Sequence, residues 1–254
     1  MKFIPDLLWS EIKAIIPEKI GKVGRPESDN RRALNGIVFI LKTGCQWRYL
    51  PEKYGPPTTV HGKFMNWCRL GIFKKMMIKA REYYRRRNSK NNWFAFDVLA
   101  KKAPFANFSG KNPTDRGKRG IKYPLLVDRK GAPLFINISA ANTHDSQLFE
   151  PFIKKMKRSK NIRIIAADSA FDVKRFYVQC KEKNLALIAS PNPRRKKEVH
   201  KFSVPHRWIV EQTFGILSWF RGIKICWSKT FESALAMHQI ACSLRLFTMS
   251  GIFG

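Results

Sequence analysis

The stretches WFAFDV at residues 93–98 and IRIIAAD at residues 162–168 decide the fold class of this chain. Each is an apolar run of strand length that reaches an aspartate, Asp97 in the first and Asp168 in the second. Further strands are predicted at residues 125–127, 134–138 and 185–189, the first two joined across a turn at 128–131. Helical patterns at residues 149–156 and 176–183 separate the later strands, and a long final helix is expected from near Pro205. This order favours an α/β fold whose mixed sheet begins antiparallel and continues in alternating strand–helix units.

The residues before this sheet have a helical period. Four segments carry apolar residues at helical spacing, at residues 8–16, 28–43, 58–70 and 72–87, and Ser28 is the expected cap of the second. We therefore expect a small basic, all-α, helix-turn-helix-like DNA-binding domain at residues 1–90 and a catalytic domain at residues 91–254, with the polar run NSKNN as the joint. A helical dimerisation or packing cap is the alternative for the first domain.

The charge of the chain points to a polyanionic partner. Its 254 residues include 49 Lys and Arg against 18 Asp and Glu, a net charge of +31, which excludes an ordinary metabolic enzyme. Because 44% of the residues are hydrophobic, the chain can still form a core, so the excess charge is not that of a disordered tail. DNA is the expected partner, and an acidic membrane surface is a distant second.

Two further features bear on location and chemistry. The N-terminus has no signal peptide pattern, and the apolar stretch 234–253 is interrupted by His238, Gln239 and Arg245, which is typical of a buried helix and not of a membrane span. We expect a cytoplasmic, nucleoid-associated protein. The five cysteines are odd in number and include no CxxC pair, so neither disulfides nor a zinc site is predicted.

Three carboxylates are the candidate catalytic residues. Asp97 and Asp168 end apolar runs, where sites in α/β sheets gather, and Glu211 shares a helical face with Arg207 and small residues. Such an all-oxygen set suits Mg²⁺ or Mn²⁺, and two such ions can promote in-line phosphoryl displacement. Taken singly, either aspartate is more simply read as a helix cap or turn residue, and it is the pair together with Glu211 that favours a catalytic role. The set indicates a nucleic-acid enzyme of RNase H-like kind.

Several motifs carry a family resemblance. Residues 24–73, with TGCQWRYLP at 43–51 as the most specific piece, resemble the N-terminal domain of bacterial insertion-sequence transposases of the insertion-sequence-five type. Successive blocks at 110–120, 125–134, 139–152, 166–172 and 206–222 are similar to the DDE catalytic domain of that family. The resemblance implies an RNase H-like fold and assigns the metal-binding DDE triad to Asp97, Asp168 and Glu211. It further implies recognition of terminal inverted repeats, hydrolysis at the element ends, transfer of the 3′-hydroxyl into target DNA, and a homo-oligomer in the DNA complex.

Basic residues around the expected site are the candidate DNA contacts. They are Arg116, Lys118, Arg119 and Lys122 in a Gly-containing loop, Arg194 and Arg195 before the glutamate helix, and Arg207 and Arg221 in that helical region. A merely solvated loop is the alternative for the first group. His144 is a possible neighbour of the metal ligands, although a helix cap at Thr143 or Asp145 is the simpler interpretation.

The sequence departs from the family pattern near the glutamate. That pattern has Tyr, Arg, Glu and Lys at fixed spacing; Arg207 and Glu211 match it, while Val204 and Ser218 stand at the Tyr and Lys positions. Val98 and Leu99 follow the first aspartate where small polar residues are usual, and Pro124 interrupts a predicted strand, which is tolerated at an edge or bulge. Two other functions therefore remain open: a catalytically inactive DNA-binding relic or repressor, and an RNase H-like nuclease or resolvase.

Overall fold

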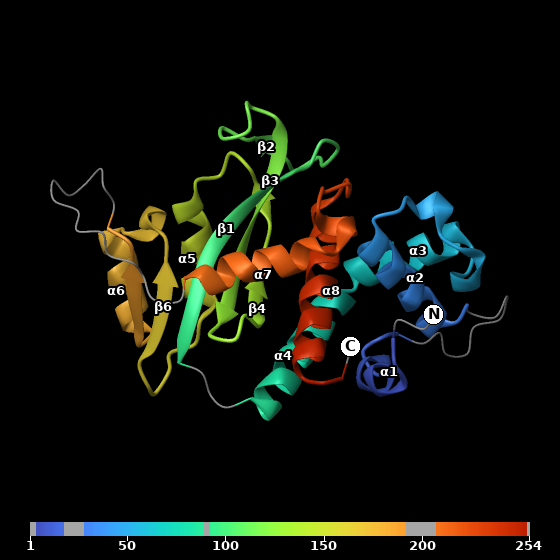
Figure 1. Ribbon diagram of the computed structural model, residues 1–254, viewed down its shortest axis with the longest axis horizontal. Helices are drawn as coiled ribbons and strands as arrows, with labels where there is room; N and C mark the ends of the chain where they lie inside the picture. The colour runs from blue at the N-terminus through green and yellow to red at the C-terminus, as the bar shows by residue number, and fades with distance from the viewer. Residues whose placement is uncertain (1–3, 18–27, 89–91, 192–206, 253–254) are drawn as a thin grey trace. The chain divides into compact units, whose positions relative to one another are not determined.

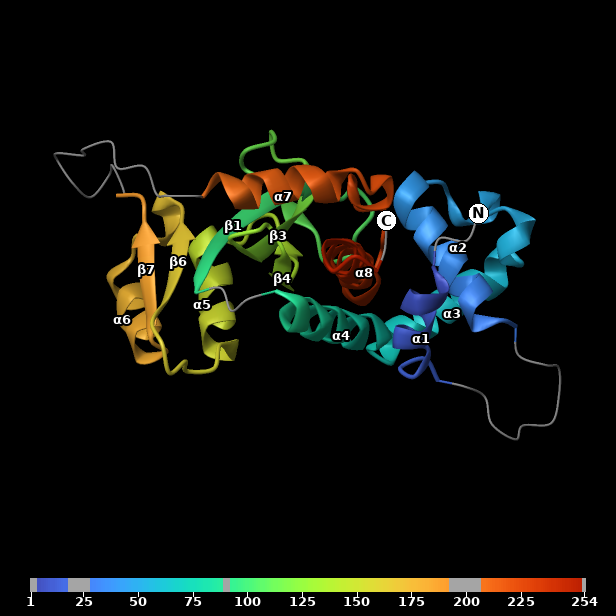
Figure 2. The same cartoon turned by 60° about the horizontal axis from the view of Figure 1, so that its bottom comes forward.

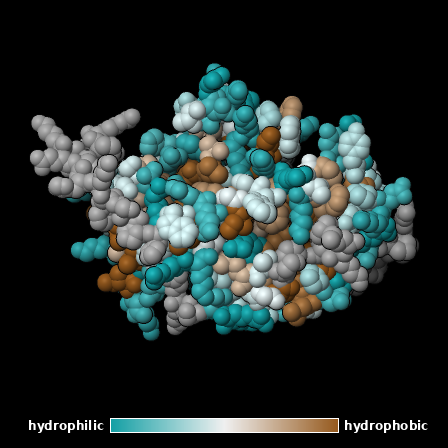
Figure 3. Space-filling model, viewed as in Figure 1, coloured by the Kyte–Doolittle hydropathy of each residue, from teal (hydrophilic) through white to brown (hydrophobic). Residues whose placement is uncertain are grey.

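The computed structural model describes residues 4–17, 28–88, 92–191 and 207–252 of the chain. It divides into two compact units, one comprising residues 1–88 and 217–254 and the other residues 89–216. We call them the helical unit and the sheet unit, and each is described by itself (Figure 1). Hydrophilic residues predominate on the face shown in Figure 3, as expected from the 49 Lys and Arg residues.

The helical unit contains short helices joined by tight turns. Its elements are α1 (Asp6–Lys13), α2 (Asn30–Thr43), η1 (Trp47–Tyr49), η2 (Glu52–Tyr54), α3 (Pro57–Arg69), α4 (Ile72–Arg87), η4 (Arg221–Ile223) and α8 (Phe231–Met249). Asp29, and not the expected Ser28, caps α2, because its carboxylate accepts from the N–H groups of Arg31 and Arg32. Gly44 ends the same helix in the left-handed region, at φ 71°. The predicted all-helical N-terminal region is confirmed.

The C-terminal residues differ from expectation in two ways. The predicted long final helix is in fact α7 (Trp208–Ser218), η4 and α8, because the chain turns after Ser218 and α8 starts anew at a Thr230 cap. In addition, residues 217–254 belong to the helical unit, whereas the predicted boundary assigned all of 91–254 to one domain. The physical reason is that α8 is apolar on most sides and packs against α4, where Arg87 donates a 2.6 Å hydrogen bond to the Ser250 carbonyl.

The sheet unit is built around one mixed sheet. Its strands are β1 (Trp93–Lys102), β2 (Gly110–Lys111), β3 (Arg119–Asp128), β4 (Pro133–Ile136), β5 (Ser139–Ala140), β6 (Arg163–Ala167) and β7 (Leu185–Ala189). The main order is β2-β3-β1-β6-β7, with β4 and β5 also paired to β3. β1 is antiparallel to β3 and parallel to β6, and β6 is parallel to β7. The predicted mixed α/β sheet is confirmed.

Two helices cover opposite faces of this sheet. Phe96 of β1 packs against Phe149 of α5 (Asp145–Lys155), with ring centroids 4.9 Å apart. On the other face, Tyr123 of β3 packs against Phe214 of α7, with centroids 5.2 Å apart. Figure 2 shows α5 and α7 on the two sides of the sheet. The remaining elements of the unit are η3 (Ser169–Phe171) and α6 (Lys174–Glu182).

Strands β1 and β3 are longer than predicted. β1 continues past Val98 to Lys102, and β3 runs straight through Pro124, which lies opposite Val98. Pro124 is neither in an edge strand nor at the bulge of β3, which lies between Leu126 and Val127. It falls where pairing on the far side of β3 passes from β5, at Lys122, to β4, at Leu125. The ladder on that side is therefore interrupted where the proline lacks an N–H group.

Helices long and apolar enough for a membrane span do not occur in the part of the chain that the structure describes.

Candidate active site

Asp97 and Asp168 come from neighbouring parallel strands. Ala95 of β1 lies opposite Ala166 of β6, so continuing the same register by two residues brings Asp97 level with Asp168. β6 ends at Ala167, and Asp168 turns the chain out of the sheet by accepting a 2.7 Å hydrogen bond from the Ser169 N–H. Asp97 lies within β1, which continues beyond the end of its partner. The two aspartates thus lie level with each other at the carboxyl edge of the parallel strands, the usual place for a site in such sheets.

The surroundings of Asp97 disfavour its charged form. Its side chain is 18% exposed, and burial raises the pKa of the carboxyl group from 3.8 to about 6. A 2.8 Å hydrogen bond from the Val98 N–H and the charge of Arg207 oppose this rise in pKa, while the charges of Asp168 and Glu211 add to it. The charges of both other predicted catalytic carboxylates therefore raise the pKa of Asp97.

Glu211 is presented by α7 on the same face of the sheet as Asp97. Side chains alternate along a strand, so Asp97, its partner Leu125 and Tyr123 share one face, and α7 packs on that face through Phe214. The buried Thr213 hydroxyl fixes the helix, 3.2 Å from the Gly131 carbonyl and 2.8 Å from the Ile209 carbonyl.

Arg207 bridges two of the three carboxylates. Its Nη1 atom lies 3.2 Å from Asp97 Oδ2, and its Nη2 atom lies 2.7 Å from Glu211 Oε1. The sequence predicted Arg207 as a DNA contact on the helical face of Glu211, and the bridge between the two carboxylates was not predicted. The missed signal is the spacing of Arg207 and Glu211, four residues apart on one helical face.

The donor set has the chemistry that Mg²⁺ or Mn²⁺ requires, because all three side chains are carboxylates and two of them repel each other across neighbouring strands. Among the described residues, however, no three His, Cys, Asp or Glu side chains lie close enough to hold a metal ion as they stand. The guanidinium of Arg207 provides the positive charge between Asp97 and Glu211. A metal ion shared by these carboxylates therefore requires Arg207 to move aside.

The outward face of α7 is open beside Glu211. Trp208, Gln212 and Gly215 are exposed on this face, and a Cβ atom added at Gly215 would meet no heavy atom within 4 Å. The Trp208 side chain, 57% exposed, was not singled out from the sequence, although it stands one helical turn before Glu211. At Gly215 no side chain blocks the approach to Glu211 along this face.

The basic Gly-containing loop forms a hydrogen-bonded turn between β2 and β3. Asn112 donates through its N–H to the Lys118 carbonyl at 2.8 Å and accepts at its own carbonyl from the Gly117 N–H at 2.9 Å. Arg116 and Lys118 are exposed on this turn. Arg119 is exposed as well, but its guanidinium donates to the Ser109 hydroxyl and the Ala106 carbonyl.

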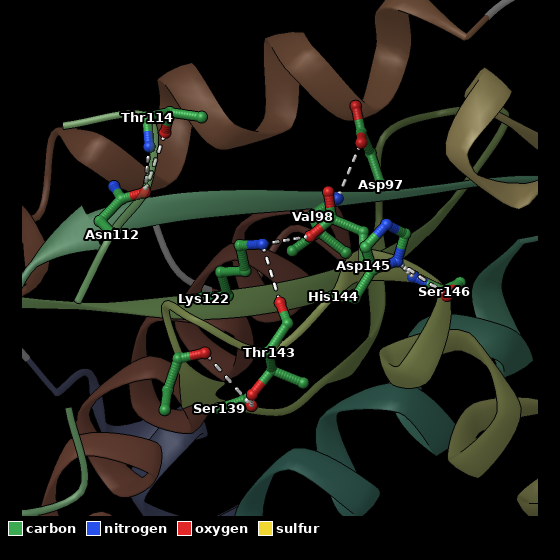
Figure 4. Close-up of polar contacts among 11 residues, drawn as sticks. Asp97, Val98, Asn112, Thr114, Lys122, Ser139, Thr143, His144, Asp145 and Ser146 are labelled. Atoms are coloured by element: carbon green, nitrogen blue, oxygen red, sulfur yellow. Dashed lines mark hydrogen bonds and ion pairs between the residues drawn. The ribbon is translucent and has the colours of Figure 1, made fainter. Parts of the chain in front are cut away.

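Lys122 and His144 are engaged in local structure (Figure 4). Lys122 Nζ lies 2.8 Å from Asp145 Oδ1 and donates at 2.8 Å to the Thr143 carbonyl. Since Lys122 and Leu125 are an odd number of residues apart on β3, Lys122 lies on the sheet face opposite Asp97. His144 itself caps α5 by accepting from the Ser146 N–H, so the cap expected at Thr143 or Asp145 is displaced by one residue.

Three further arginines were predicted as DNA contacts, namely Arg194, Arg195 and Arg221. Arg194 and Arg195, like Val204 and Pro205, lie outside the described residues. Arg221 is exposed at the start of η4, in the helical unit, where its backbone lies against Gly44.

Two family models match consecutive parts of the chain, which together span residues 4–246. Residues 4–77 match the family described as "Putative transposase of IS4/5 family", and residues 77–246 match the family described as "Transposase DDE domain". The second match alone spans more than half of the chain.

Individual relatives agree with these matches. The chain is 25% identical over 144 residues to the Burkholderia cepacia protein "Putative transposase for insertion sequence element IS402", covering 54% of this chain and 67% of that protein. It is 34% identical over 79 residues to "Insertion element IS402 uncharacterized 16.2 kDa protein" of the same organism, covering 29% of this chain and 54% of that protein. Among solved structures, the piggyBac transposase in its synaptic complex with hairpin DNA aligns with a TM-score of 0.51 at 13% identity, over 98% of this chain and 73% of that one. At this identity the likeness concerns the fold alone.

Proposed function

The chain belongs to the family of transposases with a DDE domain, and from this premise we propose that it is an active DNA transposase of an insertion sequence. It binds the terminal inverted repeats of its element, hydrolyses the phosphodiester at the end, and transfers the resulting 3′-hydroxyl strand into target DNA. The alternatives are a DNA-binding relic that does not cut and an RNase H-like nuclease without strand transfer.

The assembly of three carboxylates from distant parts of the chain carries this proposal. Asp97, Asp168 and Glu211 come from β1, the end of β6 and α7, and the Asp97 carboxyl group senses the charges of the other two. Like charges brought together at a partly buried position cost free energy, so a fold that keeps them there favours a role for them. The proposed role is to hold a divalent cation.

The residues of the chain would act as follows. Asp97 and Asp168, on neighbouring strands, would hold Mg²⁺ or Mn²⁺ together with Glu211 from α7. The bound cation supplies activation of the attacking water or 3′-hydroxyl and stabilisation of the leaving oxygen. Arg207, released from the carboxylates, would pair with a DNA phosphate, for which a guanidinium is well suited. Trp208 and Gly215 would let the DNA end pass close to Glu211.

DNA binding and assembly belong to the same proposal. The net charge of +31 supports attraction to the phosphate backbone, and the exposed Arg116 and Lys118 are proposed contacts in the sheet unit. Arg194, Arg195 and Arg221 are retained as proposed DNA contacts on the grounds of sequence. Because two element ends must be processed together, we propose a homo-oligomer in the DNA complex.

The test is cleavage of a labelled duplex that carries the repeats flanking the coding region, with full-length protein and Mg²⁺ or Mn²⁺. We expect cutting at the element end that depends on the cation and is lost in Asp97→Asn, Asp168→Asn and Glu211→Gln. Glu182→Gln, at an exposed carboxylate on α6, is the matched control and should cut normally.

Three outcomes separate the alternatives. Cutting followed by joining to a target plasmid supports transposition. Specific binding without cutting by the wild-type protein would favour the relic or repressor. Cutting of branched or hybrid substrates without preference for the element ends would favour the nuclease.

A further inference from the structure

Helix α3 of the helical unit is anchored firmly along one face. Val60, Phe64 and Trp67 are buried, and the Phe64 ring lies 5.2 Å from the Trp47 ring and 5.6 Å from the Phe73 ring, between centroids. These contacts tie α3 to η1 before it and α4 after it. A helix held in this way presents its opposite face in one fixed orientation.

The opposite face of α3 is a continuous exposed row. Thr58, Gly62, Asn66 and Arg69 follow one another at helical spacing, and all four are exposed. We call these four residues the α3 row. No acidic residue occurs anywhere in α3. The neighbouring helix α2 is also free of acids, but residues 33–38 at its centre are all buried. The central part of α2 therefore belongs to the core of the helical unit, whereas α3 has an exposed face.

Gly62 has no structural reason to be glycine. A Cβ atom added there would meet no heavy atom within 4 Å, and its backbone is not in the left-handed region. Among the described glycines, only Gly62 and Gly215 combine these two properties. A glycine in the middle of an exposed helix lowers stability relative to alanine, so its presence favours the close approach of something outside the chain.

We propose that α3 is the helix that reads the sequence of the terminal repeat, with the α3 row lying in the major groove of duplex DNA. This inference rests on the proposed function, because that function supplies the DNA. It adds which helix enters the groove, a choice that the sequence pattern left open between several helices.

Duplex DNA fits the α3 row in size, charge and hydrogen-bonding capacity. The major groove admits one α-helix, and Gly62 at the centre of the row removes the side chain that would hold the helix away from the bases. Asn66 carries the amide group that pairs with adenine through two hydrogen bonds, and Thr58 offers a hydroxyl and a methyl group. Arg69 at the end of the row, and Arg48 of η1, whose guanidinium lies 4.7 Å from the centre of the Tyr49 ring, are the proposed phosphate contacts.

The experiment is selection of binding sites by the full-length protein from a library of duplexes with a randomised core, without metal. We expect the wild-type protein to enrich one motif, also present in the repeats that flank its coding region. Asn66→Ala should weaken binding to that motif by about tenfold to a hundredfold and relax the preference at one base pair. Arg69→Gln should weaken binding to all sequences alike and reduce the salt dependence.

The variant Gly62→Ala tests whether Gly62 serves DNA binding or the stability of the protein. Since nothing inside the protein opposes the added methyl group, the thermal midpoint should rise by about 1–4 °C, while binding to the selected motif weakens. Asn161→Ala, at an exposed asparagine of the sheet unit, is the control and should select the wild-type motif with wild-type affinity.

Two failures are distinguishable. If the wild-type protein enriches a motif and the Asn66 and Gly62 variants bind it unchanged, the assignment of α3 is wrong and the proposed function stands. If the wild-type protein enriches no motif at all, the proposed function is wrong, and this inference with it.

Discussion

The Nη1 atom of Arg207 lies 3.2 Å from the Oδ2 atom of Asp97, so the chain supplies its own cation to a partly buried carboxylate of the candidate active site. The same guanidinium reaches Glu211 at 2.7 Å. A metal ion held by these carboxylates would therefore compete with Arg207 for the same oxygen atoms.

Removal of the guanidinium should strengthen metal binding. In Arg207→Gln the carboxylates lose their internal partner, so we expect Mn²⁺ to bind about two- to fivefold more tightly, since losing an ion pair of this kind changes a binding free energy by about 0.5–1 kcal/mol. Calorimetric titration, or the Mn²⁺ spin resonance signal, measures the affinity without any catalytic readout. Arg158→Gln, at an exposed arginine of the sheet unit, should leave the affinity unchanged. Weaker Mn²⁺ binding in Arg207→Gln would contradict the competition.

Asp97 should make the metal-free protein less stable as the pH rises. Its folded pKa, about 6, exceeds the ordinary value of 3.8, so its contribution to stability is fully present below pH 3.8 and is lost as the pH passes through 6. We expect Asp97→Asn to equal the wild-type protein in unfolding free energy near pH 4 and to exceed it by up to about 3 kcal/mol above pH 7. Denaturant unfolding with a chelator present, from pH 4 to pH 8, measures this difference. A constant difference over that range would show that Asp97 is not responsible.

The hydroxyl of Thr213 should position α7. Replacement by valine keeps the shape but removes the hydrogen bond to the Gly131 carbonyl, so we expect a loss of about 1–2 kcal/mol in unfolding free energy. Thr213→Ser keeps the hydroxyl and is the matched control for Mn²⁺ affinity, which should fall in the valine variant and recover in the serine variant. Equal Mn²⁺ affinity in both would mean that this hydrogen bond does not hold Glu211 in place.

Two lysines predicted as DNA contacts should behave differently. Lys118 is exposed on its turn, whereas Lys122 is paired with Asp145. Lys118→Gln should lower the slope of log affinity against log salt by about 1, and Lys122→Gln should leave that slope unchanged while lowering the unfolding free energy by about 1 kcal/mol. Fluorescence anisotropy at several salt concentrations, with thermal unfolding in parallel, measures both. An altered slope in Lys122→Gln would restore it as a phosphate contact.

Much of the fold could be predicted because the spacing of apolar residues shows whether a segment is a helix or a strand and which of its faces is buried. The runs at Trp93 and Ile162 became parallel neighbours in the sheet, and the four N-terminal helices formed where the apolar spacing indicated. The ends of elements were less predictable: Asp29 and His144 are the caps where adjacent residues offered the same chemistry. The length of β3 was underestimated because Pro124 is a strand breaker unless the pairing on each side of the strand is known.

By itself, the sequence determined the mixed α/β class, the helical N-terminal region and the three carboxylates to be considered. These features depend on the spacing of apolar residues and on the residue types within short segments, which the sequence shows directly. Only the tertiary structure decided that Arg207 bridges Asp97 and Glu211, that Lys122 faces away from them, and that α8 packs with the N-terminal helices. The physical reason is that a pattern shows which face of an element is apolar or charged, whereas the partner of that face is chosen by packing between segments far apart in the chain.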